Sequence, residues 1–130
     1  MQPTISTAST AWLKLAVVYL ILGIGLGIAM GASENFTLRP VHAHLNLLGW
    51  TTMALAGLIY TVFPRAGASR LAKIHFWLMN AALPVMMGAL AVLLATGNKS
   101  VVPVLASSEI VAAVAVLAFA ANLFLNLKND

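Results

Sequence analysis

Two histidines, His42 and His44, stand in an apolar run that continues to Phe63. Ionisable side chains are costly inside a membrane, so they are interpreted as functional by default. In a helix, residues two apart differ by roughly 200° in direction, so these two rings face nearly opposite sides and cannot easily share one small ion. Each ring can instead reach a different cleft. Because a haem iron takes one imidazole per face, the pair suits axial ligation of two separate haems.

Asn46 and Glu109 are the polar residues that we expect to support the histidines. Asn46 follows His42 by one helical turn, and Glu109 is the only acid inside any apolar run, at roughly the depth of the histidines. A bare carboxylate there is costly, so we expect it to be protonated, hydrogen-bonded, or close to a cation or a metal. Two roles for Glu109 stay open: proton relay or ligand support, and simple hydrogen bonding between helices.

His75 is a third histidine in an apolar run, beside Lys73. If the second and third runs form a hairpin, His75 lies level with about Tyr60 and roughly 20 Å or more from His44. We therefore expect His75 to be separate from the other two histidines, near the membrane surface, where an imidazole can stay hydrated.

The composition excludes a soluble domain, because 62% of the 130 residues are hydrophobic and only 8% are charged. Typical soluble domains are about 45–50% apolar and about 25% charged. The absence of cysteine excludes disulfides, thiolate metal sites and iron–sulfur clusters. The basic residues stand at the ends of apolar runs, which favours a role in membrane topology and predicts no nucleic-acid partner.

Four apolar runs must position these side chains: about 11–31, 41–63, 71–96 and 102–125. Each has about 20 residues or more, which is long enough to cross the lipid bilayer as a helix. They lack the alternation of barrel strands. We predict an all-α membrane protein in which residues 1–130 form a single domain of four transmembrane helices.

The basic residues also predict the orientation of these helices. Lys14, Arg65, Arg70, Lys73 and Lys128 fall on one side, against Arg39 and Lys99 on the other. The more basic side is cytoplasmic. We therefore expect a multi-pass protein of a bacterial-type inner membrane, with both termini cytoplasmic and His42 and His44 near the outer face.

Gly23, Gly27 and Gly31 form a stripe of small residues along the first run. Small residues at this spacing allow helices to approach closely in lipid. The stripe fits packing within one protomer, and contact between protomers is the alternative.

The second run resembles the haem-ligand helix of the haem-copper oxidase superfamily. The resemblance lies in His42-Ala43-His44-Leu45, Gly49, Gly57-Leu58-Ile59-Tyr60 and Phe63-Pro64. It is closest to the catalytic subunits of nitric oxide reductases and cbb3-type oxidases. It implies that His42 binds the high-spin, reactive haem and His44 the low-spin haem.

The family's catalytic subunit has about twelve helices in three four-helix arcs, so the resemblance implies that this chain is one arc and forms a homotrimer. Lys99 matches the place of the family's propionate-binding basic residues. Arg39, beside the His pair, can hold a haem propionate bidentately or can be a surface charge at the headgroups. The family's copper-ligating His pair has no counterpart in 91–96. A full oxygen-reducing haem–copper centre is therefore not expected, while copper as a bound metal stays open.

The main hypothesis is a haem b-binding membrane protein for electron transfer or for binding or reducing nitric oxide or oxygen. Its cofactor residues are His42, His44, Arg39 and Lys99, supported by Asn46 and Glu109. An electron-donor protein or a quinol is the expected partner besides lipid, and an oxidoreductase activity stays open.

The alternative is a haem-free accessory or transport protein that handles copper or zinc with His42, His44 and Glu109. A third is a structural subunit whose histidines only hydrogen-bond between helices.

Overall fold

The chain forms a bundle of four long helical spans in the computed structural model, which describes residues 5–127. The spans are Thr7–Ser33, Arg39–Val62, Arg70–Thr96 and Lys99–Asn126, and each is long and apolar enough to cross a membrane. No strand occurs in the described residues. The predicted all-α membrane fold with four transmembrane helices is thus confirmed.

The elements follow one another along the chain with short connections. They are α1 (Thr7–Ser33), α2 (Arg39–His44), the π-helix η1 (Leu45–Thr52), α3 (Met53–Val62), α4 (Pro64–Gly67), α5 (Arg70–Thr96), the 3-10 helix η2 (Lys99–Val101) and α6 (Val102–Asn126). The connection between the second and third spans therefore contains one short helix, α4, which begins at Pro64.

Local capping explains where the longest helices begin and end. The side chains of Ser6 and Ser69 accept hydrogen bonds from the backbone N–H groups of Ser9 and Ala72, which caps α1 and α5. Gly97 ends α5 in the left-handed conformation, with φ of 68°, which only glycine adopts readily. Helix α1 consequently begins four residues before the predicted residue 11, because Ser6 is its cap.

A π-helix interrupts the second span, which the sequence pattern did not predict. It covers Leu45–Thr52, directly after His44. The Thr52 hydroxyl donates to the carbonyl of Leu47, five residues earlier and 2.7 Å away, and thus bonds across one wide turn. Short π-helical stretches in α-helices occur frequently at functional sites.

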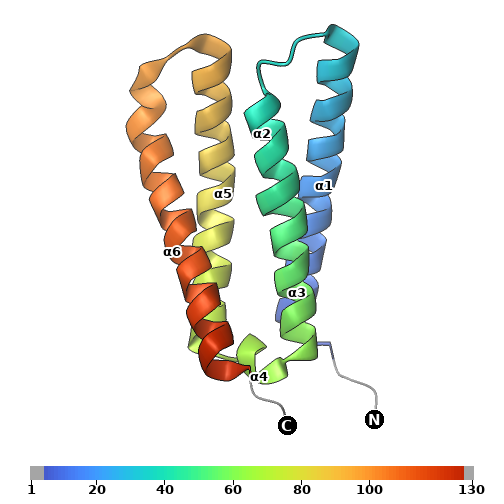
Figure 1. The fold of residues 1–130 in the computed structure, drawn as a ribbon, viewed down its shortest axis with the longest axis vertical. Coiled ribbons are helices and arrows are strands. Elements are labelled where there is room, and N and C mark those ends of the chain that lie inside the picture. Colours follow the sequence, from blue (N-terminus) through green and yellow to red (C-terminus); the bar gives the residue numbers. More distant parts are fainter. Residues whose placement is uncertain (1–4, 128–130) are drawn as a thin grey trace.

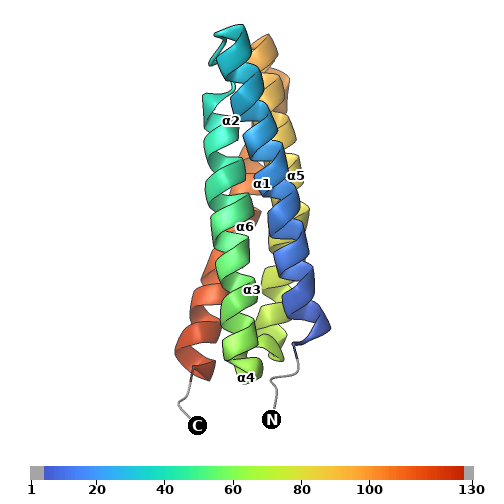
Figure 2. The ribbon, with the colours of Figure 1, turned by 90° about the vertical axis from the view of Figure 1, so that its right-hand side faces the viewer.

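The four spans pair as two antiparallel hairpins (Figures 1 and 2). Helix α1 packs on η1 and α3, and α5 packs on α6, with α4 between the hairpins at one end. We call this end, where α1 begins and α6 ends, the terminal end, and the opposite end the distal end. The terminal end carries Arg65 of α4 and, in the first turn of α5, Arg70 and Lys73. The distal end carries Arg39 at the start of α2 and Lys99 at the start of η2. Lys128 lies outside the described residues.

Two glycines of the stripe allow α1 to pack closely against the second span. A methyl group on Gly23 would lie 2.6 Å from the Asn46 side chain, and one on Gly27 would lie 2.8 Å from the His42 ring. Gly31 faces open space. The stripe thus serves packing within the protomer at Gly23 and Gly27, as one of the two interpretations predicts.

Candidate functional site

His42 turns from α2 towards α1. Its Nδ1 lies 2.8 Å from the carbonyl oxygen of Gly23. A carbonyl can only accept, so Nδ1 carries the proton and Nε2 has the free lone pair. Metal-binding histidines usually donate their other ring N–H in this way, which fixes the tautomer and the orientation of the ring.

Asn46 lies beside His42, as expected. Its Nδ2 donates to the backbone carbonyl of His42 at 2.8 Å. The same Nδ2 is 3.3 Å from Nδ1 of His42, but this is a contact between two donors, because Nδ1 already donates to Gly23. The side chains of Asn46 and His42 occupy the space on the surface of α1 where Gly23 and Gly27 have no side chains.

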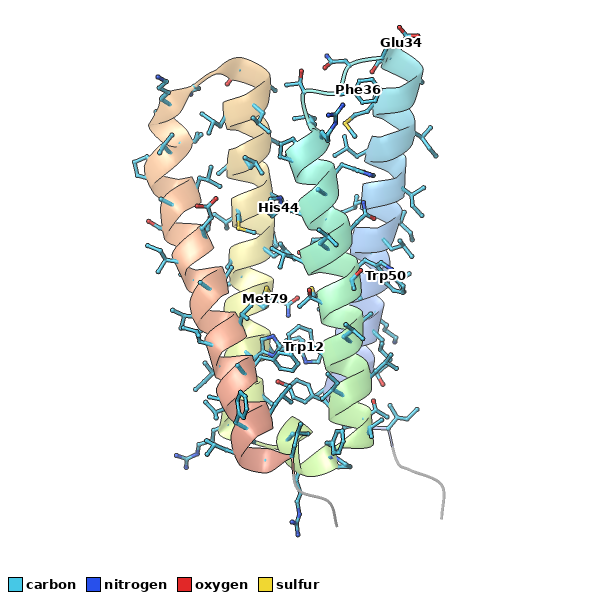
Figure 3. All side chains as sticks on the ribbon, viewed as in Figure 1. Trp12, Glu34, Phe36, His44, Trp50 and Met79 are labelled. Carbon is cyan, nitrogen blue, oxygen red and sulfur yellow. The ribbon has the colours of Figure 1, made fainter. Side chains whose placement is uncertain are left out.

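His44 turns the other way, towards the α5–α6 hairpin (Figure 3). Its Nδ1 lies 2.7 Å from the carbonyl oxygen of Pro40, so this ring also has a free Nε2 lone pair. The ring borders a cavity of about 280 Å³ that α5 and α6 complete. The two imidazoles thus face different sides of their helix, as their spacing predicts.

Glu109 lines the same cavity as His44. Met79 and Met86 of α5 also line it, so a carboxyl, an imidazole and two thioethers border one cavity. His44 and Glu109 are both exposed on the surface of the single chain, in spans that cross the membrane. A carboxyl and an imidazole that face lipid are costly. We call this surface the His44–Glu109 face.

Arg39 and Lys99 are not brought to this cavity. Both are exposed, and neither is among the residues that line it. The Arg39 guanidinium lies 5.4 Å from the centre of the Phe36 ring, in a cation–π contact. Both residues remain at the distal end, where they can interact only with a group that extends beyond the cavity.

The described residues contain no group of three or more His, Cys, Asp or Glu side chains that could hold a metal ion. His42 and Glu109 lie on different sides of the second span, so a small ion could not use His42, His44 and Glu109 of one chain together.

His75 belongs to a second cluster at the terminal end, and the expectation that it is hydrated is wrong. It is fully buried, and its ring lies 4.5 Å from that of Trp12 and 4.7 Å from that of Phe119. The predicted level with Tyr60 is correct, since the Tyr60 hydroxyl is 2.9 Å from His75 Nδ1. The imidazole is dry because each of the other three spans contributes an aromatic ring beside it.

Asn122 extends this cluster, which we call the terminal cluster: Trp12, Tyr60, His75, Phe119 and Asn122. Asn122 is fully buried, and its Nδ2 donates to the carbonyl of Ala66 at 3.0 Å and to the Tyr60 hydroxyl at 3.4 Å. Its Oδ1 accepts from Ser69 Oγ at 2.8 Å. The sequence alone does not indicate this network, because the partners of Asn122 are up to 62 residues away.

The fold and the site define a multi-pass α-helical membrane protein with two tautomer-fixed histidines on opposite sides of one span. No protein family matches the chain, and no curated protein or solved structure matches it with statistical significance.

Proposed function

We propose that this chain is a haem b-binding integral membrane protein, related to haem-copper oxidase subunit I, that transfers electrons or binds a small gas. The observation that supports it best is His44. Its ring is fixed by Pro40, its Nε2 lone pair is free, and it borders a cavity at membrane depth. A haem iron needs one such nitrogen per face.

The donor set fits a haem, but the cavity in one chain is too small for all of it. At about 280 Å³ it lies just below the range of about 300–1,000 Å³ for pockets of drug-sized ligands. A porphyrin on His44 would therefore extend past the surface of this chain. That agrees with a haem held between protomers, on the face where His44 and Glu109 need cover.

A second copy of the chain supplies such cover in the proposed homotrimer. His42 of one protomer and His44 of the next would hold the haem, with Glu109 and Asn46 beside them. The His42 ring packs against Gly27 and does not line the cavity of His44, so the proposal depends first on His44. Arg39 and Lys99 would meet the propionates at the distal end.

The bound haem would supply reversible one-electron chemistry. The residues of the chain orient and tune it: the Gly23 and Pro40 carbonyls fix the two imidazoles. Glu109 offers a carboxyl beside His44, where it can hold or pass a proton. An electron-donor protein or a quinol remains the proposed partner.

The test is the optical spectrum of the protein from haem-replete cells, with its native mass. A Soret band with b-type bands and a trimeric mass are expected. His44→Ala should remove the haem signal, and Ser107→Ala, on another part of α6, should not. If His42→Ala disturbs every haem equally, the haem is bridged. A colourless protein that takes up no haem would contradict the proposal.

A copper site without haem is the second candidate, favoured by one observation. His44, Glu109, Met79 and Met86 border one cavity, and thioether and imidazole groups together suit Cu(I). Metal analysis of the pure, colourless protein distinguishes the two proposals. Copper that disappears in Met79→Leu and Met86→Leu would favour this candidate.

A further inference from the structure

A second cavity, of about 330 Å³, lies at the terminal end between α1, α3, α4 and the start of α5. Its walls include four aromatic side chains, Trp12, Tyr60, Phe76 and Trp77, and it is also lined by Lys73. We call it the aromatic cavity. Its volume lies in the range of about 300–1,000 Å³ that is typical of small-molecule sites.

Trp12 gives this cavity an unused hydrogen-bond donor. Its side chain is 1% exposed and packs edge-on against Phe76, with the ring centres 5.2 Å apart. Within residues 5–127, no side chain or backbone group accepts a hydrogen bond from its indole N–H. Nε1 of Trp12 is not among the fully enclosed polar atoms that lack a partner in this part of the chain, so the N–H is accessible, and an acceptor atom in the cavity would satisfy it.

The charges around the aromatic cavity favour an electron-rich acceptor. Lys73 is exposed on α5, and both α1 and α5 begin near the cavity, at Thr7 and Arg70. The first turns of helices carry partial positive charge. These charges stabilise a carbonyl oxygen of the ligand and its reduced, more negative forms.

We propose that the aromatic cavity binds the head group of a membrane quinone. A flat ring would stack on the aromatic walls, and one ring carbonyl would accept a hydrogen bond from Trp12. The ammonium group of Lys73 would attract the second carbonyl oxygen. Trp77 is 70% exposed at the edge of the cavity, which leaves an apolar tail a path into lipid. A phospholipid phosphate fits less well, because Lys73 is the only cationic side chain among the lining residues.

The proposal does not depend on haem, because none of the residues that line the aromatic cavity belongs to the His44–Glu109 face. Its test is equilibrium dialysis of decylubiquinone, a short-tailed quinone, against the full chain in detergent. One saturable site per chain is expected. The same binding by His44→Ala protein would separate this result from the fate of the haem proposal.

Two variants test where the quinone binds. Trp12→Phe keeps a ring and loses the donor, so affinity should fall about two- to tenfold, the value of one neutral hydrogen bond. Ala8→Leu places a large side chain in the cavity from an exposed position and should abolish binding without unfolding the protein. Trp50→Phe, which is not among the lining residues, is the matched control and should bind normally.

Two results would overturn the proposal. One is partitioning that never saturates and is equal in all three variants, which would mean that the quinone dissolves only in the micelle. The other is displacement of the quinone by an equimolar anionic phospholipid, together with unchanged affinity in Trp12→Phe. That result would identify the aromatic cavity as a lipid site.

Discussion

Nδ1 of His42 lies 2.8 Å from the carbonyl oxygen of Gly23, and this contact joins α2 to α1 at residues 19 positions apart. The backbone of α1 is reachable there because Gly23 and Gly27 have no side chains to keep the imidazole away. The orientation of His42 therefore depends on two glycines of α1 as well as on the position of His42 in its own helix, α2.

Gly27→Ala should displace the His42 ring, since the added methyl group would lie 2.8 Å from its Cε1 atom. Gly31→Ala is the matched control, because a methyl group there meets open space. Both changes raise helix propensity by a similar amount. Gly27→Ala should therefore be less stable than Gly31→Ala by about 1–3 kcal/mol, the usual cost of overpacking.

Unfolding of both variants in the same detergent measures this difference. If the protein binds haem as proposed, the haem content of each variant also shows whether the ring has moved. Equal stability with equal haem content would mean that the ring adapts freely and that Gly23 and Gly27 do not fix it.

The four spans could be predicted because each depends only on local hydropathy and length. The opposite directions of His42 and His44 could be predicted for the same reason, since helical geometry is local. The π-helix after His44 could not, because its sequence has no periodicity that differs from the α-helical runs around it.

The terminal cluster could not be predicted either. His75 lies two residues after Lys73 in the sequence, which favoured a hydrated position. Its burial results from Trp12 and Phe119, which belong to the first and last spans of the chain. Likewise, Glu109 was expected at the depth of His44, but only the packing of α6 against α5 places both residues at one cavity.

Tyr60→Phe should destabilise the bundle, because it removes the hydroxyl that His75 Nδ1 and Asn122 Nδ2 both contact. His75 Nε2 already has no partner in its buried position within the described structure. Losing the partner of Nδ1 as well should cost about 1–3 kcal/mol, the usual penalty for an unsatisfied buried polar group.

Tyr19→Phe is the control for this change. The described residues provide no hydrogen-bond partner for the Tyr19 hydroxyl, so its removal should change the unfolding free energy little. The two variants are compared by chemical unfolding in detergent. A Tyr60→Phe protein as stable as Tyr19→Phe would show that the hydrogen bond to His75 does not hold the cluster.

Asn122→Leu should be the most disruptive single change at the terminal end. It leaves the buried Ala66 carbonyl and the partly buried Ser69 hydroxyl without the Asn122 side chain as their partner. The expected loss is about 2–5 kcal/mol, since each unsatisfied buried group costs about 1–3 kcal/mol and part of the loss can relax.

Asn126→Leu is its control, because Asn126 is half-buried and donates only to Asn122, at 2.7 Å. Protease resistance of the segment around α4 reports the change directly, since Asn122 ties α4 to α6. Equal resistance in the two variants would contradict a central role for Asn122.

Glu109→Leu tests whether the His44–Glu109 face contacts a second copy of the chain. If this face met lipid, replacing an exposed carboxyl by an apolar side chain would stabilise the single chain, because the cost of the polar group would vanish. If a second copy and its haem cover the face, the change removes a polar partner and should weaken the assembly about tenfold or more, the effect of losing one hydrogen bond to a charged group.

Ser107→Leu is the matched control on α6, since the Ser107 hydroxyl already donates to the Pro103 carbonyl at 2.7 Å. Native mass spectrometry across a dilution series measures both. Glu109→Leu protein that assembles as tightly as Ser107→Leu, and is more stable than the unchanged chain, would assign this face to lipid.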